Sequence, residues 1–552
     1  MNTKKIIIVG GVAGGMSAAT RLRRLDEQAE IVIYEKGPYV SFANCGLPYY
    51  VSGEISNRDD LIVQTPEKLK ARFNLDVNPN HEVISVDPET KSIQVKHKNQ
   101  VFQDKYDSLI LAPGAKPFIP PIKGLDQATN TFSLRNIPDL DQIMFHLNQE
   151  EIKEAVVVGA GFIGLEMAEN LHLRGISVTI VEMAPHVLPP FDEEMANFVK
   201  RELLQNGIKV LTGISAQEFK DNGQTVVLSD GSQLNSDLNL LSVGVSPNTD
   251  FLAGSGIELG MKNGILVDEH YQTNIPDIYA VGDAMISKHQ ITGQEAIISL
   301  ASPANRQGRQ VADIIVGLKN SNRGSIGTAI VRVFNIQAAS TGLSERLAKM
   351  NNLNYQVVHV TDKNHAGYFP GATPVILKMI FNPETREIYG AQGFGQDGID
   401  KRMDIIATAI KGGLTVSDLI ELELTYAPPF GSAKDPVNML GYAGENLING
   451  YSESVQWYEL TDLLDQGHIL LDVRENDELK ESTPFKRSIH IPLSTIRQNL
   501  DQLDKDKSYI VSCASGQRSY VAERILKQEG FKAKNLDGSH VIYAMTQGNE
   551  IA

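Results

Sequence analysis

The two cysteines are the residues whose type and setting say most about chemistry. In 552 residues the chain contains only Cys45 and Cys513, which lie far apart in unlike contexts, so a framework of structural disulfides is excluded. Such scarcity is typical of a reducing compartment, and we expect a cytoplasmic protein. An isolated cysteine is most often a buried apolar side chain. Both of these lie in glycine- and serine-rich turn sequence, which favours reactive thiols.

A complete dinucleotide-binding pattern lies in the first third of the chain. An apolar strand at 155–158 runs into a turn in which Gly159, Gly161 and Gly164 form G-x-G-x-x-G. This pattern permits a tight turn, close approach of a pyrophosphate and packing of the following helix. The next predicted strand ends at Glu182, where a carboxylate can bind a ribose diol.

A second, imperfect copy of this pattern opens the chain. The strand at 6–9 runs into a turn with Gly10 and Gly15, but Val12 replaces the middle glycine. Glu35 ends the following strand, as an acid does in the other copy. Two turns with correctly placed acids argue against the alternative of a ligand-free α/β domain. Because glycine breaks the first apolar run early, we expect a buried strand there and not an export signal.

Composition and charge limit the partners of this protein. The chain is 42% hydrophobic and 21% charged, and no apolar run approaches the ~18 residues that cross a bilayer. The formal net charge of -16 disfavours nucleic acid and anionic membrane surfaces, so we expect neither as a partner. An anionic ligand therefore needs a local basic pocket.

Beyond the complete dinucleotide pattern the sequence predicts further domains. A strand and turn at 278–284 precede a predicted helix at 304–316, and a β-rich stretch begins near residue 329. A polar segment at 444–455 predicts a linker, and about a hundred residues remain for one small α/β domain. At roughly 150 residues per domain, the length suggests three or four domains.

Roughly residues 1–450 resemble the two-dinucleotide-binding-domain flavoprotein disulfide reductases. Residues 111–115 (LAPGA), which end at Ala115, match the crossover between the two folds of that family, and Asp283 stands in its second FAD motif. The resemblance implies that the first fold binds FAD, with Asp283 on the ribityl chain, and that the inserted second fold binds NAD(P)H. Glu182 would repel a 2′-phosphate, which favours NADH.

The redox motif separates the subgroups of this family. It reads SFANCGLPY over residues 41–49 and contains one cysteine, Cys45. Members of the glutathione-reductase type carry C-x4-C and form an internal disulfide, which this chain cannot form, so Cys45 must pair with an external group. The segment, together with residues 303–309 and 426–434, resembles the coenzyme A disulfide reductases. This resemblance implies CoA as the substrate or as the bound partner in a mixed disulfide.

The same resemblance implies a homodimer and further site residues. Tyr368 and Tyr426 would reach from the second subunit to hydrogen-bond or protonate sulfur near Cys45, and the alternative is that they are core aromatics. An acidic protein also needs cations where the phosphates of CoA lie. Arginines on a helix surface are usually only solvated. The positions that match CoA contacts of the family are Ser17, Arg21, Arg24, Ser41, Asn44, Asn305, Arg309 and Lys434.

The last hundred residues resemble a rhodanese domain. The matching segments are 470–475 (LLDVRE), 490–493 (HIPL) and 513–519 (CASGQRS). The loop from Cys513 to Arg518 offers backbone N–H groups, a helix N-terminus and a guanidinium, which can stabilise a thiolate, a bound anion or a persulfide. The alternative is a degenerate rhodanese with a structural role, and the presence of the cysteine argues against it.

Together these patterns predict an α/β fold with two dinucleotide-binding (Rossmann-like) domains, an α+β dimerisation domain and a small α/β rhodanese domain. The expected boundaries are 1–115 with 246–325 for FAD binding, 116–245 for NAD(P)H binding, 326–445 for dimerisation, 446–456 for a linker and 457–552 for the rhodanese domain.

The expected reaction is the reduction of CoA disulfide, CoA persulfide or polysulfide by NAD(P)H and FAD, through a mixed disulfide between Cys45 and CoA. Only a thiolate attacks a disulfide, so we expect the site to lower the pKa of Cys45. Cys513 would couple this reaction to the transfer of persulfide sulfur.

Two other functions are open alternatives. An NADH oxidase or peroxidase uses the same scaffold with one cysteine that cycles through sulfenic acid. Those relatives typically carry a histidine in the first glycine turn, where this chain has Ala13. The second alternative is a sulfur carrier or redox sensor whose flavin is rarely reduced, and the complete NAD(P)H pattern disfavours it.

Overall fold

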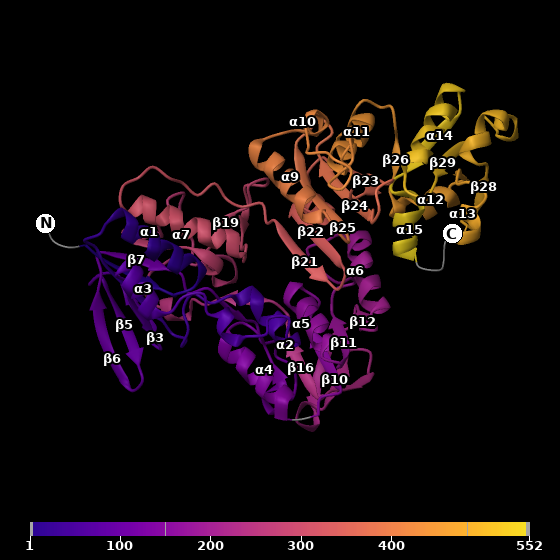
Figure 1. The fold of residues 1–552 in the computed structure, drawn as a ribbon. Helices are drawn as coiled ribbons and strands as arrows, with labels where there is room; N and C mark the ends of the chain where they lie inside the picture. The colour runs from indigo at the N-terminus through magenta and orange to yellow at the C-terminus, as the bar shows by residue number, and fades with distance from the viewer. Residues whose placement is uncertain (1–3, 150, 483, 548–552) are drawn as a thin grey trace. The chain divides into compact units, whose positions relative to one another are not determined.

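The computed structural model describes residues 4–149, 151–482 and 484–547 (Figure 1). The chain forms two compact units. Unit 1 comprises Met1–Met183 and Ile208–Gly327, and unit 2 comprises Ala184–Gly207 and Thr328–Ala552. Among the described residues, no helix has both the length and the apolar composition needed to cross a bilayer.

The first sheet of unit 1 is built around its opening strand, β1. Five strands pair in parallel in the order β18-β7-β1-β2-β3. Their bounds in that order are Ile278–Ala280, Ser108–Leu111, Lys5–Val9, Glu30–Glu35 and Asp76–Pro79. Because β1 has neighbours on both sides and helices cover the sheet, its apolar residues are fully buried. Strand β18 comes from far down the chain, so two separated segments assemble this sheet.

Two helices lie against each other beside the first sheet. Helix α1 (Ala13–Leu25) follows β1 through the first glycine turn and packs against α7 (Ala301–Ile315). The helix predicted at 304–316 is confirmed as α7, which begins and ends slightly earlier than expected.

A second parallel sheet in unit 1 repeats the plan of the first. Its order is β12-β11-β10-β16-β9. The bounds in that order are Lys209–Thr212, Ser177–Glu182, Glu154–Val158, Leu238–Leu241 and Thr131–Phe132. The second glycine turn joins β10 to α5 (Phe162–Leu173). Both predicted glycine turns therefore lie at the carboxyl end of a central parallel strand, where such sheets bind their ligands.

Unit 2 contains an antiparallel sheet covered by helices. Its strands follow the order β21-β22-β25-β24-β23. Their bounds are Ala329–Val333, Ile336–Gly342, Ile388–Gly395, Pro374–Phe381 and Gln356–Lys363. Helix α9 (Ile399–Gly412) packs on β22 and β25, and α11 (Pro436–Ile448) packs on β23 and β24. Helix α11 extends past residue 446, where the linker was expected to begin.

One helix of unit 2 comes from an unexpected part of the chain. Helix α6 (Glu193–Gln205) lies within the range expected for NAD(P)H binding, yet it contacts β21, β22 and β25 of this antiparallel sheet. The sequence pattern could not show this, because an amphipathic helix does not specify which sheet its apolar face covers.

The last sheet of unit 2 is parallel, in the order β26-β30-β29-β27-β28. Its bounds are Ser454–Val455, Lys532–Leu536, Ser508–Ser512, Ile469–Asp472 and Ser488–His490. Helix α14 (Gln517–Gln528) follows β29, and α15 (Ser539–Gln547) contacts α6. The mixed α/β fold with two Rossmann-like units, an α+β domain and a small C-terminal α/β domain is thus as predicted.

Candidate active sites

The two glycine turns have the backbone geometry that a bound pyrophosphate needs. Gly10 has φ +101°, and a Cβ there would lie 2.0 Å from the carbonyl oxygen of Ala112. Gly159 has φ +105°, and its Cβ would lie 2.3 Å from the carbonyl oxygen of Ser242. Gly15 and Gly164 approach the carbonyl oxygens of Gly10 and Gly159 as closely, whereas a Cβ on Gly161 would meet open space. Only glycine fits the first four positions, and the fifth leaves room for a ligand.

The acids that end β2 and β11 lie at these turns. Glu35 accepts hydrogen bonds from the N–H groups of Gly11 and Gly37, at 2.9 and 2.8 Å. Glu182 accepts one from the N–H of Ala160 at 2.7 Å. Burial raises the pKa of Glu35, and the two backbone N–H groups oppose that rise. Each acid is therefore held in the position from which a ribose diol can bind it.

The residues around Asp283 form a second polar cluster in unit 1. An Arg135 nitrogen lies 2.8 Å from the Asp283 carboxylate, and the N–H of Gly282 donates to the side chain of Gln307 at 2.8 Å. Ala115 begins a short strand, β8 (Ala115–Pro117), and is buried. The sequence did not predict a role for Arg135 or Gln307. Arg135 lies outside the motifs, and Gln307 lies in the segment 303–309 without a role of its own.

Cys45 lies in a single 3-10 turn (Asn44–Gly46) immediately before helix α2 (Leu47–Ser52), and it is exposed in unit 1. Partial desolvation raises the pKa of its thiol, and the charge of Glu166 raises it further. Arg135 acts in the opposite direction, whereas Asp283 adds to the rise. The expectation that the site lowers the pKa of Cys45 is therefore wrong for the protein groups alone, because burial, together with the two carboxylates, outweighs the one guanidinium.

The neighbours of Cys45 leave polar groups available for a ligand. The Asn44 side-chain nitrogen donates to the carbonyl oxygen of Arg135 at 3.3 Å, while its oxygen is buried without a hydrogen-bond partner among the described residues. Tyr49 donates to Glu166 at 3.1 Å. A buried orphan oxygen fits a group that is bound from outside the chain. Glu166 was not predicted, although it lies on the helix opened by the second glycine turn.

The structure brings five of the expected CoA contacts, Ser17, Arg21, Arg24, Asn305 and Arg309, onto the packed helices α1 and α7. Ser17 donates to the side chain of Asn305 at 2.6 Å. Arg21 lies 2.7 Å from Asp313, which was not predicted and which compensates its charge. Arg24 and Arg309 are exposed on these helices, and Ser41, which lies outside them, is half-buried with φ +47°. Lys434 is exposed and belongs to unit 2.

Tyr368 and Tyr426 form a pair in unit 2. Their hydroxyl oxygens lie 3.0 Å apart, and the hydrogen bond between them raises the pKa of Tyr368. Their side chains are 76% and 49% exposed, so the alternative that they are core aromatics is wrong. Tyr426 also lines an open depression with Lys401, Thr425, Ala427 and Phe430. The pair therefore presents two hydroxyls on the surface of unit 2.

Cys513 lies in the turn between β29 and α14 and is completely buried. Its sulfur accepts hydrogen bonds from the N–H of Gly516 at 3.1 Å and from the hydroxyl of Ser519 at 3.4 Å. The N–H of Cys513 donates to the hydroxyl of Ser539 at 3.2 Å. Of the predicted donors, one backbone N–H, that of Gly516, binds this sulfur together with the Ser519 hydroxyl, while Ser539 holds the backbone N–H of Cys513.

Arg518 is held by a carboxylate that the sequence analysis missed. Both of its terminal nitrogens donate to Glu478, each at 2.6 Å. This bidentate contact lowers the pKa of Glu478 to about 2. An anion that binds at the Cys513 loop must therefore compete with Glu478 for the guanidinium.

The chain matches three known domain families in order. Residues 4–308 match pyridine nucleotide-disulphide oxidoreductase, residues 328–436 match its dimerisation domain, and residues 456–543 match the rhodanese-like domain. The chain belongs to the pyridine nucleotide-disulphide oxidoreductase family. It is an FAD- and NAD(P)H-dependent oxidoreductase that carries a rhodanese domain, as the sequence predicted.

Three relatives show what this chain is similar to. The coenzyme A disulfide reductase of Staphylococcus haemolyticus is 36% identical over 447 residues, which are 80% of this chain and 100% of that protein. The crystal structure of reduced CoADR-RHD from Bacillus anthracis is 47% identical, covers 100% of both chains and has a TM-score of 0.98. The structure of an NAD-dependent persulfide reductase from A. fulgidus is 35% identical over 98% of this chain and 100% of that chain, with a TM-score of 0.92.

The residues of unit 1 fit the two cofactors of the family. The turn at Gly10 with Glu35 fits the adenosine end of FAD, and the turn at Gly159 with Glu182 fits that of NAD(P)H. The unpartnered oxygen of Asn44, beside Cys45, fits a bound group with a hydrogen-bond donor.

Proposed function

We propose that this enzyme reduces the sulfur–sulfur bond of CoA disulfide, CoA persulfide or polysulfide, and that a mixed disulfide between Cys45 and CoA is the intermediate. The observation that carries the proposal is the setting of Cys45. It is the only cysteine of unit 1, it is exposed, and it lies beside Arg135 and Asp283. With no second cysteine in the same unit, Cys45 cannot form a disulfide within that unit, and we propose that its partner is the sulfur of CoA.

The reaction divides into an exchange step and a reductive step. The Cys45 thiolate attacks the substrate disulfide or persulfide, forms a bond to the sulfur of CoA and expels a thiol or hydrosulfide. FAD, when bound, supplies two electrons that it receives as hydride from NAD(P)H. Reduction of the mixed disulfide then releases CoA as the thiol and restores the Cys45 thiolate. The balance is one NAD(P)H and one proton consumed for each sulfur–sulfur bond cleaved.

The tyrosine pair supplies protons in this scheme. We infer a homodimer in which Tyr368 and Tyr426 of a second copy approach Cys45, because two exposed hydroxyls hydrogen-bonded to each other can donate to a departing thiolate. The match of residues 328–436 to a dimerisation domain supports this arrangement.

We propose that CoA binds to the surface formed by helices α1 and α7. Ser17 and Asn305 already share a hydrogen bond there, and Arg21 and Arg24 bring positive charge to a chain whose net charge is -16. Phosphate groups of CoA can compete with Asp313 for Arg21, because both ligands bind guanidinium through charged oxygens. Ser41, Asn44 and Arg309 complete the proposed set in unit 1, and Lys434 of unit 2 is a further proposed CoA contact.

The rhodanese domain favours persulfide sulfur as the working substrate. The sulfur of Cys513 accepts hydrogen bonds from the N–H of Gly516 and the hydroxyl of Ser519, and a relative of 35% identity is named a persulfide reductase. We propose that Cys513 accepts or delivers this sulfur, with CoA as the carrier between the two thiols.

Steady-state kinetics test the substrate. NADH oxidation is measured with CoA disulfide, CoA persulfide and inorganic polysulfide, for the parent protein and for Cys45→Ser. We expect turnover with CoA substrates that is lost in Cys45→Ser, and a higher kcat/KM for CoA persulfide than for CoA disulfide. Much faster reduction of the plain disulfide would contradict the preference for persulfide, and rapid peroxide-dependent NADH oxidation without any thiol would favour the oxidase alternative.

A further inference from the structure

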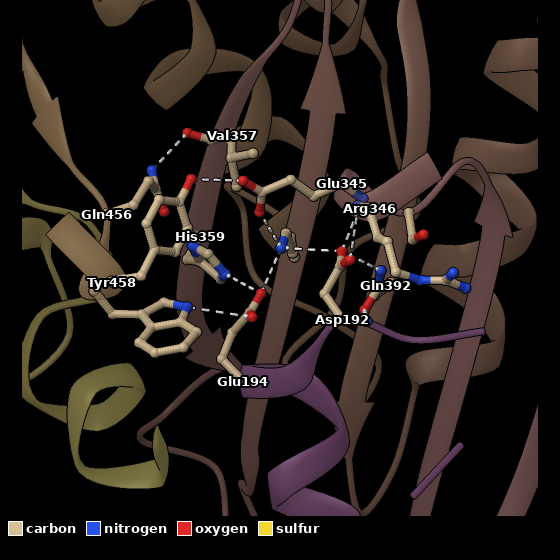
Figure 2. A network of polar contacts seen from close by, with 12 residues as sticks. Asp192, Glu194, Glu345, Arg346, Val357, His359, Gln392, Gln456 and Tyr458 are labelled. Atoms are coloured by element: carbon tan, nitrogen blue, oxygen red, sulfur yellow. Dashed lines mark hydrogen bonds and ion pairs between the residues drawn. The ribbon is translucent and has the colours of Figure 1, made fainter. Parts of the chain in front are cut away.

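A buried ionic network crosses unit 2 from its antiparallel sheet to its C-terminal domain. At its centre Lys378, on β24, is completely buried and pairs with Asp192 at 3.0 Å, with Glu345 at 2.8 Å and with Glu194. Figure 2 shows the carboxylates of Asp192 and Glu194, at the start of α6, converging with that of Glu345, the first residue of α8 (Glu345–Met350). Buried charges are costly unless each is paired, so the parts that carry these groups are held in one arrangement.

His359, on β23, is the member of this network that faces the rhodanese domain. Its Nδ1 lies 2.8 Å from the carboxylate of Asp537, and its backbone N–H donates to the same carboxylate at 3.1 Å. Its Nε2 lies 3.4 Å from Glu194, and Figure 2 shows these two side chains pointing toward each other. Burial alone would favour the neutral imidazole, but Asp537 and Glu194 outweigh it and raise the pKa of His359 to about 9. Both ring nitrogens therefore donate at neutral pH.

Asp537 lies two residues before Ser539, whose side chain binds the Cys513 loop. Ser539 accepts the hydrogen bond from the N–H of Cys513 at 3.2 Å, and the N–H of His540 donates to the carbonyl oxygen of Cys513 at 3.2 Å. The N–H of Val541 binds the carbonyl oxygen of Ala514 at 2.9 Å. Residues 539–541 thus bind the first two residues of the loop that carries the thiol.

The backbone at residues 538 and 539 has a conformation that contacts with other parts of the protein must stabilise. Ser539 has φ +49°, a left-handed conformation that is costly for a residue with a side chain and that persists only where the surroundings impose it. At Gly538 a Cβ would lie 3.3 Å from the Cβ of His359 and 2.2 Å from Ile542, so the segment passes directly against the histidine. Besides the bonds from His359, the Asp537 carboxylate accepts a hydrogen bond from the side chain of Gln456 at 3.1 Å.

We propose that His359 of the dimerisation domain is a positioning residue for the sulfurtransferase thiol: its Nδ1 holds Asp537, and residues 537–541 in turn hold the Cys513 loop in its sulfur-binding shape. The loop thereby depends on a side chain from a different domain. This inference rests on the proposed function only in taking Cys513 as the sulfur-carrying thiol.

Two near-isosteric variants separate the two contacts of His359. His359→Asn places an amide nitrogen near the position of Nδ1 and can still donate to Asp537. His359→Gln places its amide nitrogen near the position of Nε2 and leaves the buried Asp537 carboxylate without that donor. Tyr458→Phe is the matched control, because it removes a different hydrogen bond of the same domain junction, from Tyr458 to Glu345 at 2.6 Å.

The variants are made in full-length, FAD-loaded Cys45→Ser protein, where Cys513 is the only cysteine. The rate of Cys513 modification by methyl methanethiosulfonate is followed by intact mass, because a buried thiol reacts only when its loop opens. We expect His359→Gln to accelerate modification roughly 100-fold, His359→Asn to remain about tenfold slower than His359→Gln, and Tyr458→Phe to stay within about threefold of its parent.

Equal acceleration by His359→Gln and Tyr458→Phe would mean that any loosening of the junction exposes the thiol, and would overturn the proposal. The same holds if His359→Gln and His359→Asn react alike. Sulfur transfer from thiosulfate or polysulfide to cyanide is measured in parallel, with a fall in kcat and an unchanged KM expected for His359→Gln. A parent without sulfur transfer would contradict the proposed role of Cys513, while the modification rates would still decide the role of His359.

Discussion

An Arg135 nitrogen lies 2.8 Å from the carboxylate of Asp283, and this ion pair stands beside Cys45. The one guanidinium that could stabilise the Cys45 thiolate is thus already engaged by a carboxylate, and Glu166 adds a second negative charge. Burial and these carboxylates therefore raise the pKa of the reactive thiol, and its reactivity should increase as pH rises through that pKa.

Replacing Glu166 should make Cys45 more reactive at neutral pH. Glu166→Gln removes the negative charge that opposes the thiolate, so the pKa of Cys45 should fall. We expect roughly three- to tenfold faster alkylation by iodoacetamide at pH 7, measured in a Cys513→Ser background. Tyr49→Phe is the control, since it removes the hydrogen bond to Glu166 and keeps the charge. An unchanged pH profile in Glu166→Gln would show that this carboxylate does not control the thiol.

The hydroxyls of Tyr368 and Tyr426 should act as one group. Because they are hydrogen-bonded to each other, removing either should lower turnover with CoA disulfide by roughly tenfold to 100-fold. The double variant with both tyrosines changed to phenylalanine should be no slower than the slower single variant. Turnover is measured at saturating NADH and disulfide, with FAD content as the control. Multiplicative losses would instead indicate two independent roles.

Glu478 should limit the use of oxyanion sulfur donors. Glu478→Gln replaces a charged partner of Arg518 with a neutral one, which leaves the guanidinium freer to bind an anion. We expect the KM for thiosulfate in sulfur transfer to cyanide to fall by about tenfold. Glu475→Gln is the comparison on the same segment, because Glu475 binds Ser494 and acts on Arg518 only through a weaker charge interaction than Glu478 does. A KM that stays at the parent value would show that Arg518 takes no part in donor binding.

His359 should make the stability of the protein depend on pH. Its pKa is raised in the folded state, so the stabilisation is complete below the ordinary pKa of 6.5 and is lost as pH rises through about 9. The groups that face the imidazole are Glu194, Asp537 and Lys378. The difference in unfolding free energy between the parent and His359→Asn should shrink by roughly 3 kcal/mol across this range. Urea titrations at several pH values measure it, and a constant difference would contradict a charged His359.

Most of the framework of this site follows from local sequence pattern. The glycines of both turns, Glu35 and Glu182 stand at fixed offsets from a strand, so their positions were predictable. Cys45 and Cys513 were also predictable, because each lies in a short motif that can be read from local sequence. The α+β and rhodanese domains were also anticipated from the chain.

What the sequence did not reveal are contacts between distant segments. Arg135 and Glu166 act on Cys45 without sharing a motif with it, and burial together with the charge of Glu166 raises the pKa that was expected to fall. Asp313 opposite Arg21 and Glu478 opposite Arg518 compensate charges that the sequence left free. Partners of this kind depend on tertiary packing, which a single sequence does not specify.

The bond between Cys45 and CoA is the central claim, and intact-protein mass spectrometry tests it most directly. Protein purified without reductant and incubated with CoA disulfide should carry one CoA-sized adduct per chain, absent from Cys45→Ser. Anaerobic addition of one equivalent of NADH should then remove the adduct and release one CoA. If Cys45 instead carries only oxygen, or if the adduct lies on Cys513, the proposed mechanism is wrong.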